Sequence, residues 1–369
     1  MASGPLGAYL WEPRPGWGWR LVLAPLELLE APYRAAAFLH RELYARGVWS
    51  RIELPARVVS IGNLTVGGSG KTPIAGWLAA ELRARGSRVA LLSRGVQARS
   101  TAEVNVVSDG ERILLGPVDA GDEPVWLAQT TRGVPVLAGR NRAALGLRAT
   151  SLFGSEVLIL DDGFQHHRLR RDVDLVCVDH GLGLGNGHAL PRGPLRESPR
   201  ALRRADAILL TRIPASKDGA GEGGASAVPA GLPPYLPRFG MRIVPSALSR
   251  LDSPGNAPLA SLVGARVGVL CAIARPDRLA RLLRELGAVV ERVVAYPDHH
   301  LYQPRDLRGL DRNLRWITTA KDAVKLPAAW LSPLSVEILE ERVEPVEGNA
   351  LLDWLVERLA RAPKRAGAI

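Results

Sequence analysis

A glycine-rich loop between a strand and a helix constrains the fold of this chain more than any other feature. Residues 58–73 read VVSIGNLTVGGSGKTP. The apolar start predicts a buried strand, and the Gly-Lys-Thr ending predicts a turn that opens a helix. Glycines let successive backbone N–H groups approach an anion, and the positive end of the helix faces the same point. The segment therefore predicts a phosphate-binding loop in an α/β fold.

The loop departs at one position from the pattern G-x-x-x-x-G-K-[ST], because Thr65 stands where that pattern has glycine. The later glycines remain. Lys71 would hold phosphates and Thr72 would ligate the Mg²⁺ of a nucleotide. We expect the nucleotide to be bound by Thr65, Val66, Gly67, Gly68, Ser69, Gly70, Lys71 and Thr72.

A second strand supplies the acids that such a loop requires. Four apolar residues at 157–160 lead directly into Asp161 and Asp162. A buried parallel strand that presents carboxylates at its tip is typical of the magnesium site of nucleotide-dependent phosphotransferases. We therefore expect Thr72, Asp161 and Asp162 to hold Mg²⁺, and the sequence leaves open which aspartate is the direct ligand.

Other polar residues follow predicted strands, where open α/β sheets bind ligands. Arg94 follows the strand at 88–92, and Asp122 stands in a turn before a helix. His299 and His300 follow the strand at 289–295, and the segment 321–325 follows another. Each of these residues can also be interpreted without a functional role: Arg94 as a surface arginine, Asp122 as a helix cap, and His299 and His300 as solvated histidines. Adjacent histidines without cysteine or spaced histidine partners make a poor zinc signature.

Length and charge bound the remaining possibilities. A chain of 369 residues predicts at least two domains. We expect an N-terminal helical segment at 1–50, a nucleotide-binding domain at 51–244 with a flexible insertion at 214–238, and a second α/β domain with its own sheet at 245–369. The net charge of +11 permits nucleic acid, an anionic membrane surface or a phosphorylated substrate. Cys177 and Cys271 lie in apolar runs and are expected in the core.

The N-terminal segment is amphipathic. It contains Trp11, Trp17 and Trp19, and its apolar run at 21–29 is interrupted by Pro25 and Glu27. A spanning helix needs ~20 apolar residues, so this run cannot cross a bilayer. Its apolar positions, including Leu29, recur at helical spacing opposite charged positions, including Glu30. Such a helix either packs on the protein's own core or lies on a membrane surface.

Taken together, these motifs resemble the tetraacyldisaccharide 4′-kinase family, the lipid A 4′-kinases of Gram-negative bacteria. The matching stretches cover nearly the whole chain in order and are 62–73, 121–124, 161–166, 185–187, 193–197, 297–300 and 321–325. The stretches Asp-Asp-Gly-Phe-Gln-His and Gly-Asn-Leu-Thr-Val-Gly-Gly carry most of the specificity. The resemblance implies a P-loop NTPase-like parallel sheet with a second, smaller α/β domain and an N-terminal amphipathic helix.

The resemblance also implies a reaction. It implies transfer of the γ-phosphate of ATP to the 4′-hydroxyl of tetraacyldisaccharide 1-phosphate, with Mg²⁺, at the cytoplasmic face of the bacterial inner membrane. The protein would sit there as a peripheral protein without a nucleic-acid partner. Asp122 is then the base, assisted by a histidine that we assign to His299, although the sequence does not fix whether His299 or His300 pairs with Asp122. Lys71 is the third catalytic residue. Gln165 and His166 would line the nucleotide site. Arg94, Asn63 and Glu197 would contact the substrate.

Two other classes use a similar loop. P-loop ATPase or GTPase switches of the partition or metal-chaperone type carry a signature lysine just before the first loop glycine, where this chain has Val66. A nucleic-acid-binding ATPase is supported by the basic charge alone and lacks interleaved aromatic and basic residues. Both classes remain alternatives on the residues alone.

Overall fold

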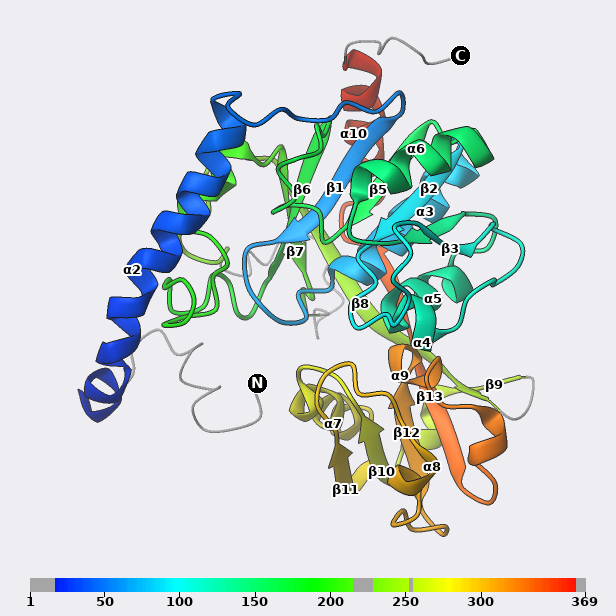
Figure 1. Ribbon diagram of the computed structural model, residues 1–369. Coiled ribbons are helices and arrows are strands. Elements are labelled where there is room, and N and C mark those ends of the chain that lie inside the picture. The colour runs from blue at the N-terminus through cyan, green and yellow to red at the C-terminus, as the bar shows by residue number, and fades with distance from the viewer. Residues whose placement is uncertain (1–16, 215–227, 252–254, 363–369) are drawn as a thin grey trace.

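The computed structural model describes residues 17–214, 228–251 and 255–362. Figure 1 shows an upper and a lower lobe, with helix α2 along the side of the upper one. The helices are α2 (Trp17–Ala45), α3 (Lys71–Ala84), α4 (Pro117–Ala120), α5 (Asp122–Thr130), α6 (Arg142–Phe153), α7 (Pro276–Glu285), α8 (Pro304–Leu307), α9 (Ala320–Ala323) and α10 (Ala350–Arg361).

A single sheet runs through both lobes. Its strands are β1 (Arg57–Asn63), β2 (Val89–Ser93), β3 (Asn105–Ser108), β4 (Val136–Ala138), β5 (Val157–Asp161), β6 (Val173–Asp179), β7 (Ala207–Thr211), β8 (Arg238–Arg250), β9 (Asn256–Ala257), β10 (Arg266–Cys271), β11 (Val289–Ala295), β12 (Arg315–Thr319) and β13 (Ser335–Pro345). Their spatial order is β11-β10-β12-β13-β8-β7-β6-β1-β5-β2-β4-β3, and β9 pairs with β8.

The nucleotide-binding lobe is built on parallel strands. Strand β1 lies between β5 and β6, and both pairings are parallel. Strands β5 and β6 are buried along their whole length, which explains the apolar run at 157–160 in β5 and the largely apolar sequence of β6. Because the carboxyl ends of parallel strands meet at one edge, the loop after β1 and the acids at the end of β5 face the same region.

The separate second sheet that the sequence predicts is not formed in the described parts of the chain. Instead, strands β8 and β13 pair antiparallel from Met241 opposite Pro345 to Arg250 opposite Glu337, with a register shift at Glu340 and Glu341. This long ribbon joins the strands of the lower lobe to those of the upper one (Figure 1). Strand β8 was missed because arginines, serines and Pro245 interrupt its apolar residues, so that no regular alternation is visible.

Helix α10, the last described helix, packs on the upper lobe. Helix α10 buries Leu351, Leu352, Leu355 and Leu359 in the same core as α3 and β1. The division at residue 244 therefore stays a prediction, since residue 244 lies inside β8 and α10 returns across it. Most of the expected insertion, residues 215–227, lies outside the described residues, while Leu232 and Leu236 near its end are buried. Cys177 and Cys271 are free and buried, as predicted.

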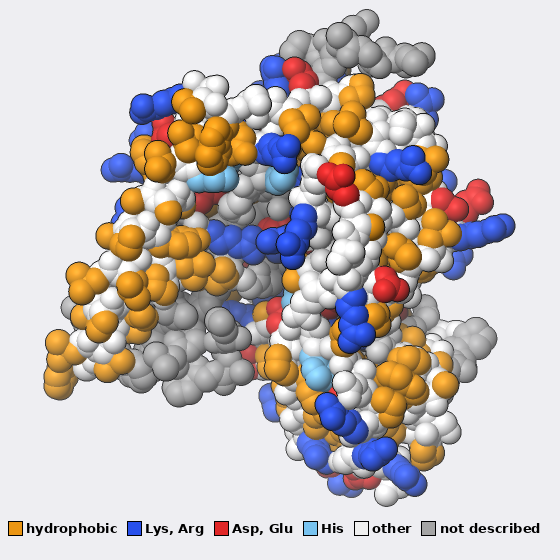
Figure 2. Space-filling view, viewed as in Figure 1, with side chains coloured by type: hydrophobic (Ala, Val, Ile, Leu, Met, Phe, Trp, Pro, Cys, Tyr) orange, Lys and Arg blue, Asp and Glu red, His pale blue; other side chains and the backbone are white. Residues whose placement is uncertain are grey.

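Helix α2 presents its apolar side outward. Leu21, Leu28 and Leu39 are 68%, 79% and 58% exposed, whereas Glu30 is 6% exposed. The sequence left open whether the apolar side packs on the protein or faces outward; in the structure Glu30 faces the protein and Leu29 is exposed. The carboxylate of Glu30 accepts hydrogen bonds from the Ala189 amide at 2.9 Å and contacts His188 Nδ1 at 2.8 Å. Figure 2 shows hydrophobic side chains along the helix.

No helix in the described ranges combines the length and the apolar character that crossing a membrane requires.

Candidate active site

Contacts with neighbouring segments on both sides fix the conformation of the glycine-rich loop. Gly70 has a φ of 80° and caps α3, and a Cβ at this position would lie 2.6 Å from Ile243 Cδ1. The Thr211 hydroxyl donates to the Ser69 carbonyl at 2.7 Å. The Val66 amide donates to the Pro194 carbonyl at 2.8 Å. The amides that face a phosphate therefore come from later in the loop and from the first turn of α3.

Thr72 and Asp161 meet as the sequence predicts. The Thr72 hydroxyl donates to the Asp161 carboxylate at 3.2 Å, and Asp161 is 1% exposed. Burial, together with the smaller effect of the Glu123 charge, raises the pKa of Asp161 to about 7. A hydroxyl and a carboxylate are hard oxygen donors, and a divalent cation would compensate this buried charge. The residues therefore fit Mg²⁺.

The described residues contain no group of three or more His, Cys, Asp or Glu side chains that could hold a metal ion alone. Magnesium in phosphotransferases usually takes one or two carboxylates, with water and substrate phosphates as the other ligands. The pair at the end of β5 is consistent with that arrangement.

Asp162 is held differently from Asp161. Its φ of 57° is uncommon outside glycine and turns its carboxylate back from the strand end. Arg196 donates to this carboxylate at 2.9 Å, and Lys71 Nζ lies 3.8 Å from it. Burial alone would raise the pKa of Asp162, but the charges of Lys71 and Arg196 outweigh burial and lower it. Arg196 was not expected in the site, although it stands beside the predicted Glu197.

Asn63, Gln165 and His166 surround the loop. Asn63 is fully buried and donates to the Thr65 carbonyl at 2.7 Å, while Gln165 donates to the Asn63 carbonyl at 3.0 Å. Burial and the charges of nearby arginines lower the pKa of His166 to about 4, so its imidazole is neutral near pH 7. In this conformation Asn63 shapes the loop, and its predicted contact with substrate stays a prediction.

Two arginines and Glu197 lie on the predicted substrate side. Arg94 is exposed at the end of β2. Arg142, which the sequence analysis missed, is 4% exposed, and its charge acts on Asp161 and Asp162. Both carboxylate oxygens of Glu197 accept hydrogen bonds from Arg204, at 2.6 and 2.9 Å. The predicted role of Glu197 in substrate binding therefore stays a prediction. In the structure, its contact with Arg204 holds the segment around residue 197 in place.

Asp122 of the upper lobe contacts His299 of the lower lobe. Asp122 begins α5 after Gly121, whose φ of 91° only glycine adopts readily. His299 Nδ1 lies 2.8 Å from Asp122 Oδ1. His300 instead contacts Asp306 at 2.9 Å and stacks on the Tyr296 ring. The geometry thus selects His299 as the partner of Asp122, a choice between His299 and His300 that the sequence left open even with the family resemblance.

Two lysines of the lower lobe also contact the acidic residues at the start of α5. Lys325 Nζ lies 3.2 Å from Asp122 Oδ2, and Lys321 Nζ lies 3.2 Å from Glu123 Oε1. Burial alone would raise the pKa of Asp122, but the hydrogen bond with His299 and the charges of Lys321 and Lys325 hold it well below its usual range. The segment 321–325 had been noted at a strand end, which was the available signal for both lysines.

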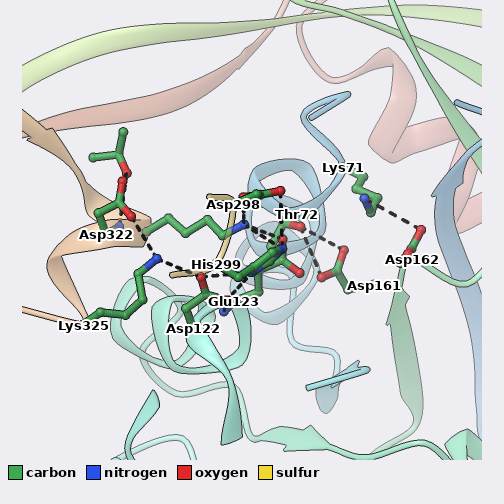
Figure 3. A network of polar contacts seen from close by, with 12 residues as sticks. Lys71, Thr72, Asp122, Glu123, Asp161, Asp162, Asp298, His299, Asp322 and Lys325 are labelled. Carbon is green, nitrogen blue, oxygen red and sulfur yellow. Dashed lines mark hydrogen bonds and ion pairs between the residues drawn. The ribbon is translucent and has the colours of Figure 1, made fainter. Parts of the chain in front are cut away.

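The two halves of the site face each other. Figure 3 shows Lys71, Thr72, Asp161 and Asp162 in one close view with Asp122 and His299. Glu123, next to Asp122, is close enough to Asp161 for its charge to act on it. The arrangement therefore brings a phosphate loop, a cation site and a proton-accepting pair to one place, as phosphoryl transfer to a hydroxyl requires.

Comparison with known proteins gives a consistent result. The family model described as tetraacyldisaccharide-1-P 4′-kinase matches residues 19–360. Curated tetraacyldisaccharide 4′-kinases from Syntrophus aciditrophicus and Anaeromyxobacter sp. strain K are 41% and 42% identical, over 87% and 97% of this chain and 89% and 97% of theirs. The crystal structure of LpxK from Aquifex aeolicus in complex with ATP has a TM-score of 0.74 and 29% identity, over 92% of this chain and 99% of that one.

Proposed function

The chain belongs to the tetraacyldisaccharide-1-phosphate 4′-kinase family, and from this membership we propose how its residues divide the reaction among themselves. It is a kinase that phosphorylates the lipid A precursor with ATP, and the alternative of a P-loop switch is set aside. The observation that carries the division of roles is the contact between Asp122 and His299 at 2.8 Å beside the phosphate loop. The acceptor is tetraacyldisaccharide 1-phosphate.

The upper lobe holds the donor. Lys71 and the amides of the loop and of α3 bind the phosphates of ATP, with Gln165 and His166 at the edge of that site. Thr72, Asp161 and Asp162 are the residues that would hold Mg²⁺. When bound, Mg²⁺ offsets the charge of the β- and γ-phosphates. Lys71 is placed to act on that charge, since its ammonium already lies 3.8 Å from Asp162.

The pair of Asp122 and His299 prepares the acceptor. A sugar hydroxyl is a weak nucleophile until its proton is removed, and a positioned base contributes ~10²–10⁴-fold to such a step. The pair takes the proton of the 4′-hydroxyl while the hydroxyl oxygen attacks the γ-phosphorus and the bond to ADP breaks. Arg94 is exposed at the end of β2 and is placed to contact the anionic substrate.

Lipid-dependent ATP consumption tests this function. We expect the purified protein to consume ATP only when tetraacyldisaccharide 1-phosphate is present in detergent micelles and Mg²⁺ has not been chelated. ATP consumption that ignored the lipid would contradict the acceptor assignment. Consumption that continued at full rate with EDTA would contradict the role of Thr72, Asp161 and Asp162.

We further propose that α2 seats the enzyme on the cytoplasmic face of the inner membrane as a peripheral protein. The outward leucines at 21, 28 and 39 stand on one side of the helix, and the opposite side carries the polar contacts of Glu30 to the protein. A contiguous exposed apolar face on a helix marks an interaction surface, and an amphipathic helix of this kind can bury that face in a membrane interface. The positive charge of the chain adds attraction to anionic lipid.

Replacing Leu21, Leu28 and Leu39 together with serine is expected to weaken sedimentation with anionic phospholipid vesicles at least roughly tenfold, because each exposed leucine loses its burial in lipid. Nucleotide binding should stay unchanged, since these side chains touch no part of the ATP site. Serine at Leu147 and Leu152, which are 51% and 49% exposed on α6, is the matched control. Unchanged sedimentation of the α2 variant would contradict the membrane assignment.

A further inference from the structure

Lys325 is an internal lysine held between two carboxylates. Its side chain is 1% exposed, and Nζ lies 2.9 Å from Asp322 Oδ1 and 3.2 Å from Asp122 Oδ2. The ring of Tyr302 lies beneath the ammonium, 5.7 Å from it. Lysine is almost never fully buried unless it is paired, and a buried ion pair is weak evidence for a contribution to stability. A role in the neighbouring site accounts better for a lysine at this position.

Asp122 is saturated with contacts. Its Oδ1 accepts the Glu123 amide at 2.9 Å and faces His299 Nδ1 at 2.8 Å. Its Oδ2 faces Lys325 Nζ at 3.2 Å and the same imidazole nitrogen at 3.1 Å. An ionised carboxylate has about four acceptor positions, so these contacts use them, and Asp122 is only 3% exposed. Its oxygens are therefore not directed at a substrate hydroxyl.

The open atom of the pair is Nε2 of His299. With Nδ1 donating to Asp122, Nε2 carries the lone pair. Nε2 lies 3.4 Å from Lys321 Nζ and 3.6 Å from Asp298 Oδ2, and the His299 side chain is 15% exposed. A hydroxyl could take the place of the Lys321 ammonium as the donor to this nitrogen.

We propose that Lys325 is a positioning residue that keeps the Asp122 carboxylate ionised and oriented toward His299 Nδ1, within the pair that takes the proton of the acceptor hydroxyl. The O–H bond of the substrate breaks as its oxygen bonds to the γ-phosphorus, and the proton moves to the pair and later leaves to solvent. The charged groups around the pair are Glu123 on α5, Asp298 after β11, and Lys321, Asp322 and Lys325 at and after α9. This inference rests on the proposed function, because it assigns a residue that acts through the pair of Asp122 and His299.

The pH profile of kcat/KM, with ATP saturating, tests the proposal. Without Lys325 the carboxylates of Asp122 and Asp322 lose their shared cation, and the pair of Asp122 and His299 binds its proton more tightly. In Lys325→Met the acid limb of the profile should therefore move upward by roughly one pH unit or more, since one counter-charge at this range shifts titration by about 1–3 units. Activity lost near pH 7 should be largely recovered above pH 8, and Lys325→Arg should keep the wild-type limb.

The double variant Lys325→Met with Asp322→Asn covers the case in which the single variant does not fold. It removes the cation together with the second carboxylate, and asparagine can still accept from the Ala272 amide, which now donates to Asp322 at 3.1 Å. An upward shift smaller than that of the single variant is expected, because loss of the Asp322 carboxylate partly offsets loss of the ammonium. A loss of activity by the same factor at every pH, in either variant, would overturn the proposal and leave Lys325 a purely structural residue. Wild-type enzyme that failed to consume ATP with lipid would instead refute the proposed function.

Discussion

Asparagine in place of Asp122 is expected to lower kcat by a factor of about 10²–10⁴, the contribution of a positioned acid–base group. Asparagine removes the charge that orients His299 Nδ1, at 2.8 Å, and leaves Lys325 paired with Asp322 alone. ATP binding should be nearly unchanged, because Asp122 contacts the lower lobe and not the loop. The measurement is single-turnover phosphoryl transfer combined with calorimetric binding of ATP.

Asp119→Asn is the matched control for that variant. Asp119 precedes the same turn and is exposed, so its loss should leave kcat near the wild-type value. If Asp122→Asn turned over like the wild type, Asp122 and His299 would not be the base pair. If it lost ATP binding to the same extent as activity, Asp122 would belong to the donor site instead.

Replacing Lys71 with methionine is expected to lower kcat by a factor of about 10²–10³, the usual cost of removing one preorganised charge from developing transition-state charge. Unlike the Asp122 variant, it should also weaken ATP binding, since the lysine binds phosphates in the ground state. Lys71 is one of the cations, with Arg196 and Arg142, whose charges keep the pKa of Asp162 low. Kinetics at varied ATP and calorimetry separate the two effects.

Arg85→Met removes a cation at the far end of the same helix and serves as the control. Arg85 pairs with Asp353 at the surface, at 2.8 Å, and such pairs contribute about 0–1 kcal/mol to stability. Its variant should bind and turn over ATP normally. An Lys71→Met enzyme with wild-type kcat and ATP affinity would remove the loop from the mechanism.

The donor half of the site was predictable because its signals are local. The loop after β1 is contiguous in sequence, and Asp161 follows an apolar strand that could only be a buried parallel one. Strands of that kind place their carboxyl ends together, so Thr72 and Asp161 could be expected to meet before any coordinates were known. The observed hydrogen bond at 3.2 Å agrees.

The acceptor half was predictable only through the family resemblance. Asp122 and His299 are 177 positions apart, on different lobes. Their approach depends on the β8 and β13 ribbon, whose antiparallel pairing carries the lower lobe strands next to the upper sheet. No periodicity in either segment encodes that pairing. Lys325 and Arg196 were missed for the same reason, since each meets its partner only after the fold is complete.

The orientation of helix α2 could not be predicted from its hydrophobic periodicity. Its amphipathic spacing was visible in the sequence, but periodicity does not say which side meets the protein. The side of α2 that carries Glu30 faces the protein because Glu30 contacts the Ala189 amide and His188. Leu28, on the opposite side of the helix, is therefore exposed.

The sequence by itself therefore determined the phosphate loop, the parallel strands around it and the family, because these depend on residues adjacent in the chain. The tertiary structure decided which histidine meets Asp122, how Asp161 and Asp162 differ and which side of α2 faces outward. Those outcomes depend on contacts between distant segments, whose geometry is fixed only when both lobes pack.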